Sequence, residues 1–170
     1  MAANSSTIFA SLAASQAASS VGQGFSQSAA LRSKGEYEES LYNINRNFAE
    51  LQATDAMRRG EKGTAAVRSL TRRTVGAQRA ALAAQGIDVD SGSAREIQDD
   101  TRLQGALDEL TVKNNAWREA WGFKVAAFDS GMRGQFARMS GDSSARSTLL
   151  TGGINAVNYG LQSYAYYKKG

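Results

Sequence analysis

The sequence predicts an all-α protein built around a long antiparallel αα-hairpin, and three observations carry this prediction. The chain of 170 residues contains no proline, so no residue forces a helix to break. Two stretches with apolar residues at helical spacing flank a short central segment rich in glycine, serine and aspartate. Aromatic residues make up only 8% of the chain, which favours a thin, extended helical architecture over a thick globular core. We expect additional helical or flexible segments at both ends, and assembly as a homo-oligomer.

The first long helix is predicted from residue 37 onward. Its apolar residues recur at spacings of 4, 3, 4 and 3, namely Tyr37, Leu41, Ile44, Phe48 and Leu51. This is the heptad rhythm of a helix that packs on another helix. Gly60 and Gly63 follow, and each costs about 1 kcal/mol relative to alanine inside a helix. A bend or a weak point is therefore expected near these two glycines.

The second long helix is predicted to start at Ser93, directly after the central turn. Its rhythm has spacings of 4, 3, 4, 3 and 4, with a later aromatic residue: Leu103, Leu107, Leu110, Asn114, Trp117, Trp121 and then Phe128. Together with the residues of the first rhythm, these form the predicted helix seam or oligomer contact. Asn114 has two interpretations, a partly exposed residue or a hydrogen-bonding residue that sets register inside the bundle.

The central segment "GIDVDSGS", residues 86–93, allows three interpretations. A calcium loop of the EF-hand type needs glycine at position 6 and a bidentate acid at position 12. Counted from Asp88, glycine arrives at position 5 and position 12 is Asp99, so the register fails. A phosphate-binding loop needs a GxGxxG or GxxxxGK[ST] pattern between a strand and a helix, and neither pattern is present.

The third interpretation, a turn between two helices, explains nearly every residue of this segment. Gly86 suits the left-handed cap of a helix C-terminus, and Ile87 can fold back to complete it. Aspartates suit a turn because their side chains accept hydrogen bonds from nearby backbone amides. Serine followed three residues later by glutamate forms a capping box at the start of the next helix. The predicted turn and cap residues are Gly86, Ile87, Asp88, Asp90, Gly92, Ser93 and Glu96.

The charge distribution supports this pairing of helices. Residues 58–79 carry one acid and seven bases, whereas residues 96–119 carry six acids and three bases. If the chain folds back about Val89, residue n faces roughly residue 178 − n, which places Arg79 near Asp99 and Arg59 near Glu119. The bases are predicted either to pair with the acidic helix or to bind DNA: Arg58, Arg59, Lys62, Arg68, Arg72, Arg73 and Arg79.

Composition divides the chain into residues 1–35, the hairpin over 36–140 with its turn at 86–93, and residues 141–170. Residues 1–31 and 147–167 contain no charged side chain. The first of these segments is predicted as a flexible tail or as a weakly amphipathic helix. The N-terminal segment has the features of a poor signal peptide, and no segment reaches the run of about eighteen apolar residues that predicts an ordinary transmembrane helix. Candidate membrane contacts in an oligomer are Ile8, Phe9, Leu12, Ile154, Val157, Leu161, Tyr164, Tyr166 and Tyr167.

Large aromatic residues are absent between Phe48 and Trp117 and gather at the open end of the predicted hairpin. Arms of roughly fifty residues would be about 75 Å long at 1.5 Å per residue, too long to be stable as a lone hairpin. We therefore expect homo-oligomerisation or docking of the aromatic end on a partner.

The chain contains no histidine and no cysteine. Disulfides, Cys/His zinc sites and nucleophile–base pairs built on these residues are excluded. Two tight carboxylate pairs remain, Asp88 with Asp90 and Asp99 with Asp100. A turn accounts for the first pair and a solvated helix face for the second. We expect no enzyme, no metal site and no cofactor.

The segment "QRAALAAQGIDVDSGSAREIQDDTRLQGALDELTVKNNAWREAWGFKVAA" resembles the internal virion proteins of short-tailed bacteriophages. These are small core or ejection proteins stored in the capsid above the portal. The similar features are an alanine-rich helix leading into "GIDVDSGSA", a downstream "DELTVKNNAWREAWG", and uncharged ends. The likeness covers about residues 36–137 and is compositional rather than catalytic.

The resemblance implies a role in genome delivery. Such proteins leave the virion ahead of the DNA and assemble in the host cell envelope, the smallest one at the outer membrane, as part of a conduit. The implied partners are further copies of the chain in a ring or tube, the portal or other virion core proteins, the packaged DNA and the host outer membrane. The alternative is a helical adaptor or plug that stays at the portal–tail junction.

Overall fold

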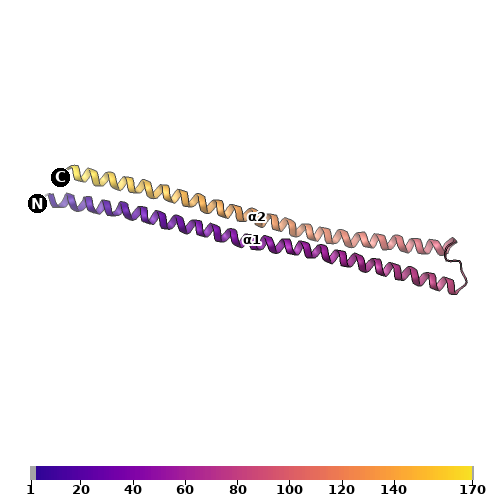
Figure 1. The fold of residues 1–170 in the computed structure, drawn as a ribbon. Helices are drawn as coiled ribbons and strands as arrows, with labels where there is room; N and C mark the ends of the chain where they lie inside the picture. The colour runs from indigo at the N-terminus through magenta and orange to yellow at the C-terminus, as the bar shows by residue number, and fades with distance from the viewer. Residues whose placement is uncertain (1–2, 170) are drawn as a thin grey trace. The chain divides into compact units, whose positions relative to one another are not determined.

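The computed structural model describes residues 3–169, with the side chains of residues 3–7, 9, 166, 167 and 169 outside the described part. Two α-helices make up the fold: α1 (Ala3–Ala84, 82 residues) and α2 (Gly92–Lys169, 78 residues). Residues 85–91 connect them (Figure 1). No strand is found between residues 3 and 169. The predicted all-α fold with two long helices that pack on each other is confirmed, whereas assembly into an oligomer stays a prediction.

The helices extend through both uncharged segments. Of the two interpretations of the N-terminal segment, the helical one is confirmed, because α1 begins at Ala3. The helix is also uninterrupted through Gly60 and Gly63. Two compact units are found: unit 1 combines residues 1–44 with 130–170, and unit 2 comprises residues 45–129. The segment limits predicted at residues 35 and 140 fall inside helices.

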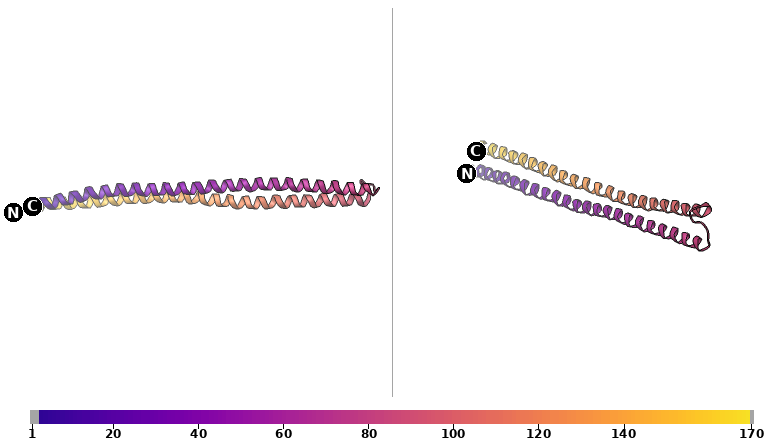
Figure 2. Two further views of the ribbon diagram at one scale, coloured as in Figure 1. Left: turned by 90° about the horizontal axis from the view of Figure 1, so that it is seen from below. Right: turned by 45° about the vertical axis from the view of Figure 1, so that its right-hand side comes forward.

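Within unit 2 the end of α1 and the start of α2 run antiparallel and side by side (Figure 2). Their contact is made mainly of small residues that recur every three or four positions, the spacing of one helix face, with Met57 and Phe123 packed against it. The buried members include Ala49, Ala53, Ala56 and Gly60 on α1, and Gly105, Ala116, Ala120 and Ala127 on α2. We call this contact the small-residue seam.

The seam allows the two backbones to approach closely. A Cβ added at Gly60 would meet the Cβ of Ala116, and one added at Gly105 would meet the side chain of Thr71. The numbers of the facing residues add to 176 in both pairs, close to the predicted value of 178. The antiparallel register predicted from a turn centred on Val89 is therefore confirmed to within two residues.

Unit 1 has a seam of the same kind, built on glycine pairs. A Cβ added at Gly35 would lie 3.1 Å from the Cα of Gly141 and 3.0 Å from the carbonyl oxygen of Ala137. Gly24 likewise faces Gly152, with 3.5 Å between the added Cβ and the facing Cα. Both pairs have numbers that add to 176, and they are 11 residues apart on each helix. An 11-residue repeat, 3.67 residues per turn, keeps one face of a helix against its partner and favours a right-handed supercoil.

Substituting two glycines of α1 tests the close approach in unit 1. Gly35→Ala places a methyl group against the backbone of α2, so we expect a loss of about 1–3 kcal/mol in the free energy of unfolding from overpacking. Gly22→Ala is the control, since nothing lies within 4 Å of its added Cβ. There alanine is expected to stabilise the helix by up to about 1 kcal/mol. Denaturant unfolding followed by circular dichroism measures both changes, and equal effects would contradict the seam.

Candidate functional site

The central loop begins with a glycine cap at the end of α1. Gly86 has φ of 73°, the left-handed conformation that glycine adopts without steric cost. The backbone N–H of Ile87 donates to the carbonyl of Leu82 at 3.1 Å, and that of Gly86 donates to the carbonyl of Ala83 at 3.0 Å. These two bonds define a Schellman cap. The predicted roles of Gly86 and Ile87 are confirmed.

Asp88 holds the turn that follows. Its Oδ1 accepts a hydrogen bond from the backbone N–H of Asp90 at 3.0 Å, and its Oδ2 accepts one from the Ser91 hydroxyl at 2.8 Å. The backbone bond from Asp90, and then the bond from Ser91, hold the pKa of Asp88 below its usual value. Both oxygens thus serve the turn, and of the three interpretations of this segment the turn is confirmed. No cluster of three or more acidic side chains suited to a metal ion occurs among the described residues.

The predicted capping box at the start of α2 is wrong. The helix begins at Gly92, whose φ is 56°, one residue before Ser93. In the described part of the chain, the side chains of Ser93 and Glu96 make no hydrogen bond to the helix terminus. The loop is instead fastened from further inside α2, by a residue that the sequence reasoning missed.

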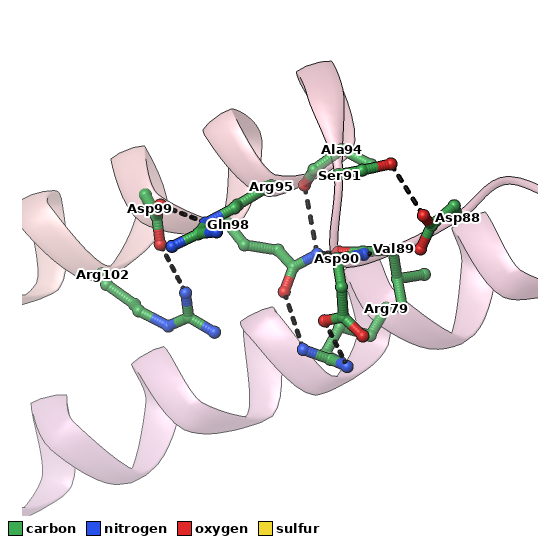
Figure 3. Close-up of polar contacts among 10 residues, drawn as sticks. All are labelled: Arg79, Asp88, Val89, Asp90, Ser91, Ala94, Arg95, Gln98, Asp99 and Arg102. Carbon is green, nitrogen blue, oxygen red and sulfur yellow. Dashed lines mark hydrogen bonds and ion pairs between the residues drawn. The ribbon is translucent and has the colours of Figure 1, made fainter.

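That residue is Gln98, which is 1% exposed. Its Nε2 donates to the carbonyl oxygens of Val89 at 2.8 Å and Ala94 at 3.1 Å, and its Oε1 accepts from Arg79 at 3.3 Å (Figure 3). Arg79 also pairs with Asp90 at 3.0 Å. One side chain therefore connects the loop, α1 and α2. In the sequence, Gln98 lies four residues after Ala94, so both residues fall on the helix face that forms the small-residue seam.

Two ion pairs were predicted across the hairpin, and one is confirmed. Arg59 Nη2 lies 2.6 Å from Glu119 Oε1, and Arg59 also pairs with Asp55. The predicted pair between Arg79 and Asp99 is wrong, because Asp99 pairs with Arg95 and Arg102 of its own helix, and Arg79 contacts the neighbouring Gln98.

The seven bases of the predicted paired or DNA-binding cluster on α1, residues 58–79, divide into two groups. Arg59 and Arg79 are paired as described, and Arg68 makes two hydrogen bonds to Glu109, at 2.7 and 3.3 Å, which raise the pKa of Arg68. The other four are exposed and have no ion-pair partner among the described residues: Arg58, Lys62, Arg72 and Arg73. The paired interpretation is therefore confirmed for three members of the cluster, whereas DNA binding by the other four stays a prediction.

The large apolar residues of the predicted helix seam lie on the outside. Asn114 is also exposed, in agreement with the first of its two interpretations. The others are 44–71% exposed: Tyr37, Leu41, Ile44, Phe48, Leu51, Leu103, Leu107, Leu110, Trp117, Trp121 and Phe128. The prediction that they pack between the two helices is wrong, because glycines and alanines occupy that contact. A contact of these residues with another chain stays a prediction.

In unit 2 the outward apolar residues of α2 form a continuous stripe. Leu103 and Leu107 flank the buried Gly105 at two residues on either side, and Asn114 precedes the buried Ala116 by two. Two residues correspond to about 200° around a helix, so stripe and seam occupy opposite faces. We call this surface the α2 stripe: Leu103, Leu107, Leu110, Asn114, Trp117, Trp121, Val125 and Phe128.

The two tryptophans of the α2 stripe stack on each other. Their ring centroids are 5.8 Å apart and their planes differ by 6°. Each is 56% exposed. Exposed aromatic side chains that already hold a fixed conformation lose little entropy when a partner covers them. The stripe therefore has the chemistry of a protein–protein contact.

The candidate membrane contacts lie near both chain ends. Five of them have aliphatic side chains that are 52–63% exposed: Ile8, Leu12, Ile154, Val157 and Leu161. Tyr164 is 65% exposed. The side chains of Phe9, Tyr166 and Tyr167 lie outside the described residues. Across residues 3–169, no helix is apolar over a length sufficient to cross a bilayer.

Comparison with known proteins yields no match to a protein-family model, to a curated protein or to a solved structure.

Replacing Gln98 tests its role in holding the loop. Gln98→Ala leaves the part-buried carbonyl of Val89 without its donor, so we expect the free energy of unfolding to fall by about 1–3 kcal/mol. Gln104→Ala is the control, an exposed glutamine of the same helix, with an expected change within about 0.5 kcal/mol. Equal losses in the two variants, measured by denaturant unfolding, would contradict the role assigned to Gln98.

Proposed function

We propose that this chain is a structural protein whose activity is self-association, without an enzymatic reaction. The observation that carries the proposal is the outward position of its large apolar side chains. A soluble monomer rarely exposes a contiguous apolar surface of this kind, and larger exposed patches mark interaction sites. Because the seam within each unit is already filled by small residues, these side chains need a surface outside their own chain.

The resemblance to internal virion proteins gives the self-association a biological setting. We propose that the chain is stored inside the capsid near the portal, in contact with the portal or other core proteins. It is then ejected and helps to form a conduit for viral DNA across the host cell envelope, at the outer membrane. The uncharged segments 1–31 and 147–167 would meet the lipid as parts of an oligomer, with polar residues toward a lumen and apolar residues toward the lipid.

The alternative role is that of a helical adaptor or plug retained at the portal–tail junction. Mass spectrometry of phage particles before and after DNA release distinguishes the two roles. The proposed role requires that the protein leaves the particle, whereas an adaptor remains in it. For the membrane step, purified protein is added to dye-loaded liposomes, and dye release is expected. Protein that neither oligomerises with lipid nor releases dye would contradict that step.

Self-association through the outer face of α2 is tested with a charge. Leu107→Asp places a carboxylate on the apolar surface, so we expect association to weaken at least about tenfold, the typical cost of losing one central interface residue. The monomer should keep its fold, since Leu107 is exposed.

Asn115→Asp is the matched control for this substitution. It introduces the same charge on an exposed position of α2 that is not part of the α2 stripe, and it should leave association nearly unchanged. Sedimentation equilibrium measures both variants. Equal weakening by the two would show a general effect of charge rather than a contact through the α2 stripe.

Binding of the packaged DNA is a second candidate function, favoured by one observation. Four exposed bases of α1 lack an ion-pair partner among the described residues: Arg58, Lys62, Arg72 and Arg73. If they neutralise phosphates, DNA affinity should fall steeply with salt concentration.

Neutralising two of these bases tests the DNA contact. Arg72→Gln with Arg73→Gln should lower the slope of log affinity against log salt by about 2, since each phosphate contact contributes about 1. Arg102→Gln is the control, because Arg102 already pairs with Asp99 and its loss should leave the slope unchanged. Fluorescence anisotropy of labelled duplex DNA gives the slopes, and a slope near zero for the unaltered protein would exclude this function.

A further inference from the structure

The α2 stripe of unit 2 is large enough for a stable contact with one partner. It presents three half-exposed leucines, a valine and three large aromatic side chains, all 49–71% exposed. At on the order of 100 Å² for each side chain, the stripe offers roughly 700–800 Å², about the area that each partner buries in a standard interface. We propose that two copies of the chain pair through their α2 stripes, antiparallel, about a two-fold axis close to Asn114.

This inference rests on the proposed self-association and specifies its surface and orientation. The first argument is the distribution of side-chain size about Asn114. Leu107 and Trp121 each lie seven residues from Asn114, and Leu103 and Val125 each lie eleven residues from it. An antiparallel pair therefore brings the leucine end of one stripe onto the tryptophan end of the other, which keeps the distance between helices uniform. A parallel pair would place tryptophans against tryptophans at one end and leucines against leucines at the other.

Asn114 supplies the second argument. It is the polar member of an otherwise apolar stripe and is exposed in the monomer. An amide side chain carries both a donor and an acceptor, so two copies near a two-fold axis can hydrogen-bond to each other. A polar residue at a single position of a helix contact favours the register that satisfies it, because other registers bury it without a partner.

The exposed charges beside the stripe agree with an antiparallel pair. Residues 96–113, before Asn114, carry five acids and two bases, whereas residues 114–128 carry two bases, Arg118 and Lys124, and one acid, Glu119. Antiparallel pairing brings the acidic end of each copy toward the basic end of the other. A parallel pair would place the two predominantly acidic halves next to each other, which disfavours association.

The outer face of α1 is a poorer partner for the α2 stripe. Over the same stretch of unit 2 it presents Arg58, Lys62, Arg72 and Arg73, none with an ion-pair partner among the described residues. Covering these bases with an apolar surface would remove them from water without compensation, which is costly. Pairing α2 with α2 leaves them in solvent.

Single-cysteine crosslinking tests the arrangement, because the chain contains no cysteine of its own. The probe is a bismaleimide that spans no more than about two helical turns. In the proposed dimer, Asn114→Cys crosslinks to itself in high yield. Leu103→Cys does not, since its two copies would lie about 33 Å apart along the helices. A mixture of Leu103→Cys and Val125→Cys chains crosslinks between chains. Ser69→Cys, exposed on α1, is the control and gives no crosslink.

Two crosslinking patterns would overturn this pairing. Equal self-crosslinking at residues 103, 114 and 125 would show a parallel pair. A crosslink between Leu103→Cys and Arg73→Cys chains, with none at Asn114→Cys, would show α2 packed on α1 of the neighbouring copy.

Sedimentation of the same samples separates this inference from the proposed function. Oligomers with either of those patterns would leave the proposed self-association standing and remove only the antiparallel pairing. A protein that stays monomeric at all concentrations, with and without lipid, would remove both. Circular dichroism of each variant establishes that its helices are intact.

Discussion

The close approach of two helix backbones is the constraint on which the rest of this structure depends. Glycine and alanine occupy the contact within each unit, and several glycines have no room for a Cβ. A contact of this kind buries little apolar area for each residue, and its stability comes from many short-range contacts between closely packed atoms. At the glycines that have no room for a Cβ, a larger side chain cannot enter without forcing the helices apart, and most of the large apolar side chains point outward.

The outward position of the large side chains gives α2 two faces of different character. In unit 2 one face is lined by small residues and fixes the hairpin, while the opposite face carries leucines and tryptophans. The faces between them are polar. α1 differs from α2 here, because its outer face becomes basic after Leu51, with Leu70 as the exposed large hydrophobic residue among those described. The two helices of the hairpin therefore offer different surfaces to any partner.

The turn and the register could be predicted from the sequence because they depend on local chemistry. Gly86 and Asp88 have conformational and hydrogen-bonding preferences that hold in almost any context, and the position of the turn determines which residues of the two helices face each other. The end of α1 and the pair between Arg59 and Glu119 follow from these signals.

The choice of seam could not be predicted from the heptad rhythm. On α2 the small residues and the large apolar residues each recur every three or four positions, on opposite faces. The heptad rule assigns the helix contact to the face with the larger apolar residues. In this chain the close distance between the two backbones determines instead which face of α2 packs on α1. The sequence does hold a signal for it, since Gly24 and Gly35 are separated by 11 residues, as are Gly141 and Gly152. Gln98 was missed for the same reason, because it becomes important only once the small-residue face is known to be buried.

The turn at residues 85–91 also has a consequence for the order in which unit 2 folds. Its cap and the bonds of Asp88 connect residues that are close in sequence, so they form with little loss of chain entropy. In an antiparallel pair of fixed register, each facing pair closes a loop only a few residues longer than the pair before it. The hairpin can thus form as a zipper that starts at Gly86 and proceeds away from the turn. Residues around Gln98 would then influence the rate of folding, whereas those around Ala53 would mainly influence the rate of unfolding.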